Sequence, residues 1–267
     1  MYNFIDTTEH QSSVDLPSEA LSINGIYIEN VIEGYRTLQV TGRELLGTEI
    51  DSLKIGRSDG ERYQGKRYPS RTITVMFQLI AAGNDVFRTS FEKLNGILNI
   101  EEAQLIFNDE TDKYFMGTPA EVGDINPGSN AVVGEFDIFC ADPFKYSMEA
   151  LSIDMNRITS KTITVGGNHI APCIIEITPT GDIIDYTITG AARNKITGTA
   201  EPIKLTNLKT GKKVIINGED GTILQDGQNK YGESDFWEFP TLLPGRNTIT
   251  VSNALCNVTI KYKPRYL

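Results

Sequence analysis

The segment RTITVMFQLI, Arg71 to Ile80, alternates apolar and polar side chains along its length. The apolar side chains of one face are Ile73, Val75, Phe77 and Leu79, and the polar side chains of the other are Thr72, Thr74 and Gln78. A period of two is the period of a β-strand, whose successive side chains point to opposite faces of a sheet. The segment therefore predicts a strand that is buried on one face only.

Shorter runs of the same kind occur throughout the chain and predict a mainly β protein. They cover residues 26–28, 104–107, 135–140, 173–178, 185–189, 213–216, 248–251 and 257–261. Asn24-Gly25 is a two-residue signal for a β-hairpin. In the second half of the chain, turn residues recur roughly every 8 to 12 residues, which is typical of a β-sandwich.

One segment has helical periodicity instead. Four apolar side chains share the spacing that places them on one side of an α-helix: Phe87, Phe91, Leu94 and Leu98. Asn84 is a suitable N-cap, and Asp85 in the first turn would be stabilised by the positive end of the helix dipole. We expect the stripe to pack on a sheet, because a lone helix among strands must bury its apolar side. A groove for a partner protein is the alternative.

The chain divides into two β-rich domains. A series of strand patterns ends at Asp142-Pro143-Phe144, residues 147–156 show little pattern, and a new series begins at Thr162. Domain boundaries usually fall in such weakly patterned segments. We expect an N-terminal domain over residues 1–147 and a C-terminal domain over residues 148–267.

The composition is that of an acidic globular protein. The 267 residues include 25 Lys and Arg against 35 Asp and Glu, which gives a formal net charge of −10, and 39% of them are hydrophobic. This apolar content excludes a disordered chain. Residues 1–13 lack the pattern of a secretory signal, and no window reaches about 18 uninterrupted apolar residues. We expect synthesis in the cytoplasm, no membrane insertion and no specific nucleic-acid binding.

The chain is poor in the residues that most enzymes and metal sites use. His10 and His169 are its only histidines. The three cysteines are far apart and form no CxxC pair: Cys140, Cys173 and Cys256. This spacing argues against a structural zinc site and against a disulfide framework, so we expect buried free thiols.

Two motifs match catalytic or metal sites only formally. Gly56-Arg57-Ser58-Asp59-Gly60 fits the G-x-S-x-G nucleophile elbow, but that motif needs a following helix, so we interpret it as a hairpin tip. One group of acids and amides could bind calcium, but turn formation explains its composition: Asn217, Glu219, Asp220, Asp226 and Asn229. We predict no catalytic residue, no metal and no cofactor. Acidic pairs on neighbouring strands keep a hydrolase as a third alternative.

Charge is unevenly distributed along the first domain. Between residues 56 and 71, five cations and two acids give a local charge of +3, the cations being Arg57, Arg62, Lys66, Arg67 and Arg71. Between residues 99 and 126, seven acids and one lysine give −6, and the acids include Glu101, Glu102, Asp109 and Asp112. Opposite charges on neighbouring copies would stabilise a head-to-tail ring, which makes these nine side chains interface candidates. On this hypothesis Arg67→Glu with Arg71→Glu loosens the oligomer. Solvated loops are the alternative.

An aromatic cluster lies in the second domain just before a Pro-Gly turn. It contains Tyr231, Phe236, Trp237 and Phe239, with acidic residues between them. A lone tryptophan usually belongs to a core, and we expect that here. The alternative is a carbohydrate-binding module in which Tyr231 and Trp237 stack on sugar rings.

Several motifs, taken together, resemble the distal tail protein family of siphophages, the phages with long non-contractile tails. They are residues 26–36 (IYIENVIEGYR), 56–60 (GRSDG) with the strand at 71–80, 139–146 (FCADPFKY), and 237–247 (WEFPTLLPGRN) followed by 249–251 (ITV). Their order and spacing cover nearly the whole chain.

The resemblance implies an N-terminal β-sandwich-type domain with one α-helix and a long β-hairpin, followed by a C-terminal galectin-like β-sandwich. It implies a non-enzymatic hexameric ring at the distal end of the tail tube, a hub with a central channel for DNA. Its partners would be the tail tube protein, a tail-associated lysin or fibre protein, the tape measure protein and receptor-binding proteins. Its location would be the tail tip of the virion.

Two details qualify what the resemblance implies. The galectin sugar-binding pattern is absent, because Ile170 follows His169 and Glu238 follows Trp237, so lectin activity does not follow from the fold. Six copies would carry a formal charge of about −60, and an acidic lumen would let DNA pass without binding it.

Overall fold

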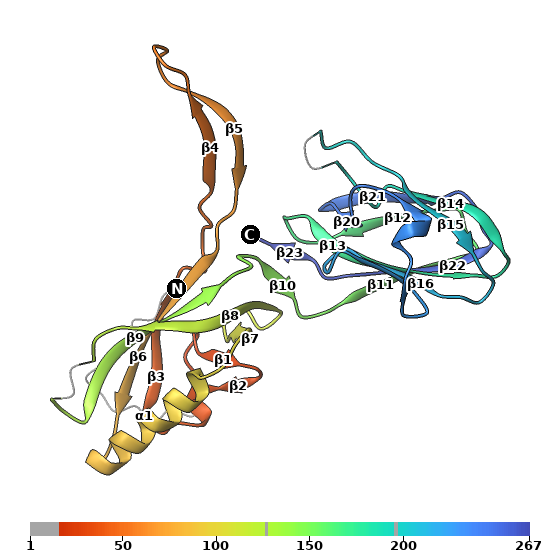
Figure 1. The fold of residues 1–267 in the computed structure, drawn as a ribbon. Helices are drawn as coiled ribbons and strands as arrows, with labels where there is room; N and C mark the ends of the chain where they lie inside the picture. Colours follow the sequence, from red (N-terminus) through yellow and green to blue (C-terminus); the bar gives the residue numbers. More distant parts are fainter. Residues whose placement is uncertain (1–15, 126–127, 195–196) are drawn as a thin grey trace. The chain divides into compact units, whose positions relative to one another are not determined.

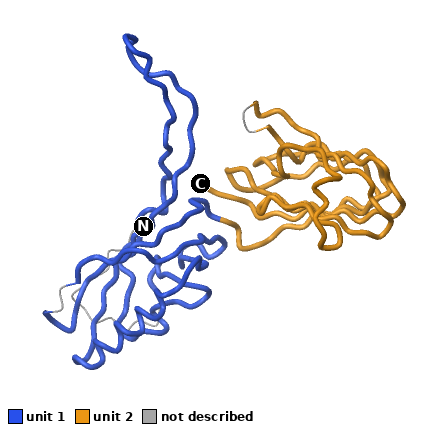
Figure 2. Tube along the Cα trace, viewed as in Figure 1, with its two compact units in different colours: residues 1–145, 267 blue, residues 146–266 orange. Residues whose placement is uncertain are grey.

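The computed structural model describes residues 16–125, 128–194 and 197–267. The chain forms two compact units (Figure 2), one of residues 1–145 with residue 267 and one of residues 146–266. His10 and the segment 1–13 lie outside the described residues. None of the described helices is long and apolar enough to cross a membrane.

Unit 1 is built on one antiparallel sheet. Its strands are β1 (Leu21–Ile23), β2 (Ile26–Tyr27), β3 (Tyr35–Thr41), β6 (Arg71–Ile80), β7 (Ala103–Phe107), β8 (Lys113–Val122) and β9 (Ala131–Cys140). They follow the order β2-β1-β7-β8-β9-β6-β3 (Figure 1). The short helix η1 (Ile28–Asn30) connects β2 to β3.

The predicted half-buried strand is β6, between β3 and β9. Its alternation places Ile73, Val75, Phe77 and Leu79 in the core of unit 1, with exposures of 0% to 1%. Residues Asn24 and Gly25 join β1 to β2 with φ of 50° and 85°. Positive φ at both positions is the signature of a type I′ turn, so the predicted hairpin is confirmed.

The predicted helix is α1 (Asn84–Leu98), and it packs on the apolar face of the sheet. Phe87 and Leu94 are buried in the sheet's core cluster, and Phe91 and Leu98 pack against it partly buried. The N-cap prediction is wrong by one residue. The cap is Gly83, with no side-chain hydrogen bond, and Asn84 is already helical.

A second, two-stranded sheet extends from unit 1 (Figure 1). Strands β4 (Glu49–Lys54) and β5 (Glu61–Arg67) pair in register from Glu49 opposite Arg67 to Lys54 opposite Glu61. We call residues 49–67 the arm. Its tip is the Gly56–Gly60 segment, so the hairpin interpretation is confirmed and Ser58 is not on a nucleophile elbow.

Unit 2 is a β-sandwich. One sheet has the strand order β11-β22-β13-β16-β17-β18. Its strands are β11 (Leu151–Asn156), β13 (Ala171–Pro179), β16 (Val214–Asn217), β17 (Thr222–Gln225), β18 (Gln228–Asn229) and β22 (Cys256–Tyr262). The short strand β20 (Thr241–Leu242) also pairs with β13. The other has the order β12-β21-β14-β15-β19, made of β12 (Ser160–Val165), β14 (Ile183–Thr189), β15 (Ile203–Leu208), β19 (Ser234–Asp235) and β21 (Gly245–Val251). The remaining elements are β10 (Lys145–Ser147), the short helix η2 (Tyr231–Glu233) and β23 (Arg265–Tyr266).

The inner faces of these two sheets form one apolar core. Cys173 and Cys256 belong to it, and Cys140 belongs to the core of unit 1; all three are buried and free, as predicted. Burial raises the pKa of the Cys140 thiol to about 11, which makes it unreactive at neutral pH. The predicted mainly β fold is confirmed.

Candidate functional site

The arm buries almost nothing within its own chain. Every described residue from Glu49 to Arg67 is exposed except Ser52 and Gly65, which are half-buried. Its apolar side chains are about half exposed or more, and they include Ile50, Leu53, Ile55 and Tyr63. A two-stranded hairpin alone in water is at best marginally stable. The arm therefore has the properties of a segment that is held by a partner.

The local charge of +3, summed over residues 56–71, does not describe the arm. Strand β4 adds acidic residues that lie next to the cations of the tip and of β5. Residues 49–67 contain five cations and four acids, a net charge of +1. Arg67 Nε contacts Glu49 Oε2 at 2.6 Å, and Lys54 Nζ lies 3.5 Å from Glu61 Oε1. Among described residues, the cations of the arm that lack an ion pair are Arg57, Arg62 and Lys66.

Arg71 was a ring-interface candidate, and the structure contradicts this. Its side chain is 3% exposed and lies at the root of the arm. Nη1 donates to the carbonyls of Gly42 and Arg43 at 3.1 and 2.7 Å, and the guanidinium lies 5.1 Å from the Phe115 ring centroid. Burial lowers the pKa of this guanidinium. Arg71 thus fixes the chain segment that leads into the arm.

The same segment is also held by one of its own residues, Arg43. Arg43 donates to both carboxylate oxygens of Asp109 at 2.8 and 2.9 Å, and its guanidinium lies 4.2 Å from the Phe107 ring centroid. Burial lowers the pKa of Arg43, but the bonds to Asp109 and the negative charges nearby outweigh it and raise the pKa overall. Gly42 has φ +88°, and a Cβ there would lie 2.2 Å from the Thr72 carbonyl oxygen. The root is therefore closely packed.

Two of the acidic interface candidates are engaged within the chain. Asp109 binds Arg43, and Asp112 pairs with Lys113 at 3.2 Å. Glu110, in the same segment, contacts Lys113 at 2.9 Å and Lys145 at 2.8 Å. Burial raises the pKa of Glu110, but the two lysines lower it by more. The pKa is therefore below its ordinary value, and the carboxylate stays charged.

The surface acids of the −6 segment are fewer than its sequence indicates. Those that are exposed and lack an ion pair among described residues are Glu101, Glu102, Glu121 and Asp124. Among described residues, no ion pair joins Glu101 or Glu102 to the arm of the same chain. They and the cations Arg57, Arg62, Lys66 and Arg67 stay candidates for contacts between copies.

The outer edge of β3 is closed by glutamate side chains. The Thr37 N–H donates to Glu29 Oε1 at 3.0 Å, and the Val40 N–H donates to Glu19 Oε2 at 2.8 Å. These are N–H groups that an added strand would need. Side chains that occupy edge donors in this way hinder the addition of a further strand, so β3 is a protected edge of the sheet.

Removing both carboxylates should open this edge. We expect Glu19→Ala with Glu29→Ala to form open-ended oligomers as concentration rises, because two backbone donors of β3 become available to another chain. Light scattering over a concentration series measures this. Glu19→Gln with Glu29→Gln is the matched control, since the amide oxygens still accept both bonds. Equal scattering from the Ala and Gln variants would show that the glutamates do not guard the edge.

In unit 2, the expectation that Trp237 lies in the core is wrong. Its side chain is 91% exposed, and Tyr231 is 58% exposed. Phe236 and Phe239 contact each other with ring centroids 5.2 Å apart and pack against the core. They anchor the loop on both sides of Trp237, which is therefore presented outward by a fixed segment.

A buried lysine anchors the preceding segment. Lys230 is 3% exposed, and its Nζ donates to Gln225 Oε1 at 2.9 Å, to the Asn207 carbonyl at 3.4 Å and to Glu233. These bonds connect β17, β15 and η2. The short helix that carries Tyr231 is thus held in place.

The supposed calcium group forms turns. Asn217 Oδ1 accepts the N–H groups of Glu219 and Asp220 at 2.9 and 3.4 Å, which is an Asx turn. Asp226 pairs with Lys212 at 2.7 Å. No group of three or more acid, cysteine or histidine side chains suited to a metal occurs in the described part of the chain.

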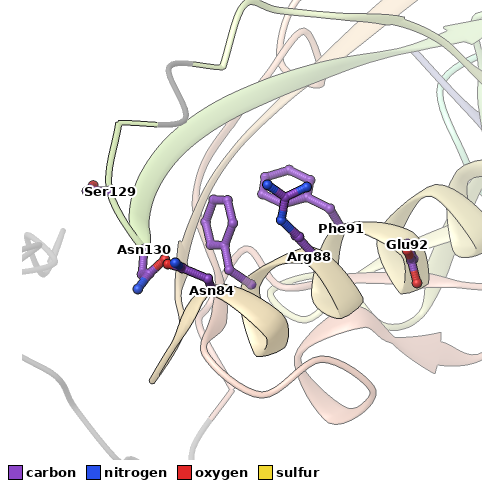
Figure 3. Close-up of a pocket in the computed structure, with 7 residues that line it drawn as sticks. Asn84, Arg88, Phe91, Glu92, Ser129 and Asn130 are labelled. Carbon is purple, nitrogen blue, oxygen red and sulfur yellow. The ribbon is translucent and has the colours of Figure 1, made fainter.

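One pocket in unit 1 was not anticipated from the sequence (Figure 3). It has a volume of about 560 Å³ and lies between the first half of α1 and the start of β9. Phe87 and Phe91 supply its apolar wall, while Arg88, Glu92 and Asn130 supply polar groups. The apolar stripe of α1 therefore serves the core and also lines this pocket.

Two family models match successive parts of the chain. The first, described as a phage tail protein RIFT-related domain, matches residues 28–139. The second, described as the C-terminal domain of a siphovirus-type tail component, matches residues 166–266. The chain belongs to the siphophage distal tail proteins. As a distal tail protein it is a structural component of the virion's tail tip, related to baseplate hubs.

A solved structure shares the fold of this distal tail protein. SPP1 Dit, described as a paradigm of the hub adsorption apparatus in phages infecting Gram-positive bacteria, matches with TM-score 0.76 and 15% identity over 93% of this chain and 99% of its own. Two structures of the activated phage p2 baseplate match with TM-scores of 0.44 (with Sr) and 0.41 (with Ca), at 10% and 11% identity, over 87% and 88% of this chain and 91% of each of theirs. No curated protein sequence matches significantly.

Proposed function

We propose that six copies of this distal tail protein form a ring at the distal end of the tail tube, with a central channel for DNA. The N-terminal domain, residues 1–147, would build the ring, and the galectin-like domain, residues 148–267, would project from it. The observation that carries this proposal is the arm, a structured hairpin whose apolar side chains are exposed. Covering those side chains requires another molecule, and a second copy supplies a repeating partner.

The contact between copies is heterologous, with the arm of one copy on a different surface of the next. Such contacts generate a ring when the rotation closes and a filament when it does not. Glu19 and Glu29, whose carboxylates accept N–H groups of β3, support closure, since they protect an edge through which sheets could extend without limit. Arg57, Arg62 and Lys66 on the arm, with Glu101 and Glu102 as acidic counterparts, supply the charge contrast that orients one copy on the next.

The ring would act as a hub. Its neighbours would be the tail tube protein, a tail-associated lysin or fibre protein, the tape measure protein and receptor-binding proteins. We assign it no catalytic step. The formal charge of −10 per copy supports an acidic lumen, which repels the DNA backbone and lets it pass.

The experiment is the mass of the purified full chain by light scattering, followed by negative-stain imaging, alone and with the tail tube protein. We expect a particle of six 29.6 kDa copies with a central hole. A single copy under both conditions would contradict the ring. An electropositive lumen in the assembled particle would contradict the role of the acidic charge.

A carbohydrate-binding module was the alternative function. The full exposure of Trp237 favours it as an addition to the hub, and its site is argued below.

A further inference from the structure

The outer face of the sheet β12-β21-β14-β15-β19 is covered by hydroxyl groups. Along most of these strands, alternate residues point inward to the core and their neighbours point outward. The exception on β14 is Ile184, which is exposed next to the exposed Asp185. The outward side chains that bear hydroxyls are Ser160, Thr162 and Thr164 on β12, Thr248 and Thr250 on β21, Thr187 and Thr189 on β14, and Thr206 on β15.

These hydroxyls form ordered rows across neighbouring strands. Thr162 lies opposite Thr248, with their Oγ1 atoms 2.9 Å apart, and Thr189 lies opposite Thr250, with their Oγ1 atoms hydrogen-bonded. β-Branched side chains have few rotamers, so the rows are stiff. Each paired hydroxyl keeps further capacity to donate or accept. The face is thus a fixed array of neutral hydrogen-bonding groups.

The charged side chains on this face balance one another. Lys204 Nζ lies 3.3 Å from Asp235 Oδ2, and the remaining charges are Arg246 and Asp185. Two cations and two acids give zero net charge on a protein whose total is −10. The outer face of the opposite sheet carries a cluster of charges instead. There the carboxylate of Glu176 lies 2.9 Å from Lys213 Nζ and 2.5 Å from Lys261 Nζ. A neutral ligand suits the hydroxyl face.

Trp237 follows the edge strand of this face. Asp235 on β19 lies opposite Lys204, Phe236 points into the core, and Trp237 is again exposed. Trp237 thus lies two residues beyond Asp235, just past the end of the edge strand β19. An indole exposed in this way offers a flat apolar surface beside groups that bind hydroxyls, and no apolar side chain of the loop covers it.

We propose that this face binds a neutral saccharide chain, with one sugar ring stacked on Trp237 and hydroxyls of the chain bonded to Asp235, Lys204 and the threonine rows. A sugar ring combines an apolar C–H face with a rim of hydroxyls, which the indole and the rows match separately. A protein partner would have to dehydrate the rows while gaining few large apolar contacts, those of Trp237 and of Ile184 on β14, which is why the saccharide is favoured. The site is independent of the arm and of the ring.

The full chain reports on this site directly, because Trp237 is its only tryptophan. We expect chitohexaose or maltohexaose, as neutral probes, to shift the indole emission to shorter wavelength in a saturable way. In affinity electrophoresis through the matching neutral polysaccharide, Trp237→Ala should weaken retention about tenfold, while Trp237→Phe keeps part of it.

A second variant separates the face from the indole. Thr187→Val with Thr189→Val removes two hydroxyls at nearly constant volume and should weaken retention although Trp237 is intact. Thr178→Val on the opposite sheet is the matched control and should leave retention unchanged.

Three results of the emission measurement would overturn the proposal. They are an unchanged emission with both neutral probes, a shift with an anionic oligogalacturonate but not with the neutral ones, and a shift that only another tail protein produces. Equal retention of Trp237→Ala and the unaltered chain would overturn it as well.

Discussion

A chain in which residues 49–67 are replaced by a short Gly-Ser link is expected to fold in both units and to remain a single copy. Glu49 and Arg67 lie opposite each other in the arm, so a short link closes the gap without strain. The cores of both units contain no residue of the arm, so their stability should change little. What is lost is the contact with the neighbouring copy, and the mass should fall from that of the ring to that of one copy.

Light scattering and circular dichroism on the same samples measure mass and folding together. The matched variant is Arg57→Glu with Arg62→Glu and Lys66→Glu, which keeps the arm but reverses its unpaired cations. It should weaken the ring most at low salt, since exposed charges more than about 10 Å apart are screened at 0.1 M salt. A ring of unchanged mass without the arm would refute the role of the arm.

Arg71→Glu is expected to destabilise unit 1 by about 3 to 5 kcal/mol, because it buries an unpaired carboxylate beside two backbone carbonyls. Arg71→Met removes the buried cation but leaves the carbonyls of Gly42 and Arg43 without their donor, which costs about 1 to 3 kcal/mol. The double change Arg67→Glu with Arg71→Glu, suggested by the sequence, would therefore report unfolding rather than loosening of an oligomer.

Urea unfolding followed by circular dichroism gives these free energies. Arg62→Glu on the exposed arm is the control, and its free energy of unfolding should stay within about 0.5 kcal/mol of the unaltered chain. Equal effects of Glu at positions 62 and 71 would contradict a buried role for Arg71.

Periodicity predicted the framework of the fold because it depends on neighbours in sequence. Strand β6, the turn at Asn24-Gly25 and the stripe of α1 were all found in this way. The same rule applies to Arg71, the first residue of β6. Arg71 has the parity of Ile73 and Val75, so the alternation itself places it on the buried face.

The charge prediction succeeded less well, because ion pairs join residues that are far apart in the chain. Asp109 is bound by Arg43, 66 positions away. Glu49 on β4 neutralises Arg67 on β5. A sum over one segment counts neither partner, which is why the contrast of +3 against −6 is smaller on the folded surface.

The sequence named Trp237 as a sugar-stacking candidate, but its expected burial was wrong, because the general preference of tryptophan for a core does not hold in this loop. Phe236 and Phe239 supply the apolar contacts of that loop, so the indole is not needed in the core. The alternation of Asp235, Phe236 and Trp237 is the signal that would have placed the ring outside.

The arm also separates two kinds of constraint on the sequence. A substitution in a core strand changes the stability of the subunit that carries it, whereas a substitution in residues 49–67 changes that stability very little, because these residues are exposed. In the proposed ring, its effect falls on the contact with the adjoining copy. Sequence differences between phages can therefore accumulate in the arm with little change in the stability of the subunit, provided that the surface it contacts on the next copy changes with it. If the arm alone, or that surface alone, were exchanged between two phages, the subunits would fold but would not assemble.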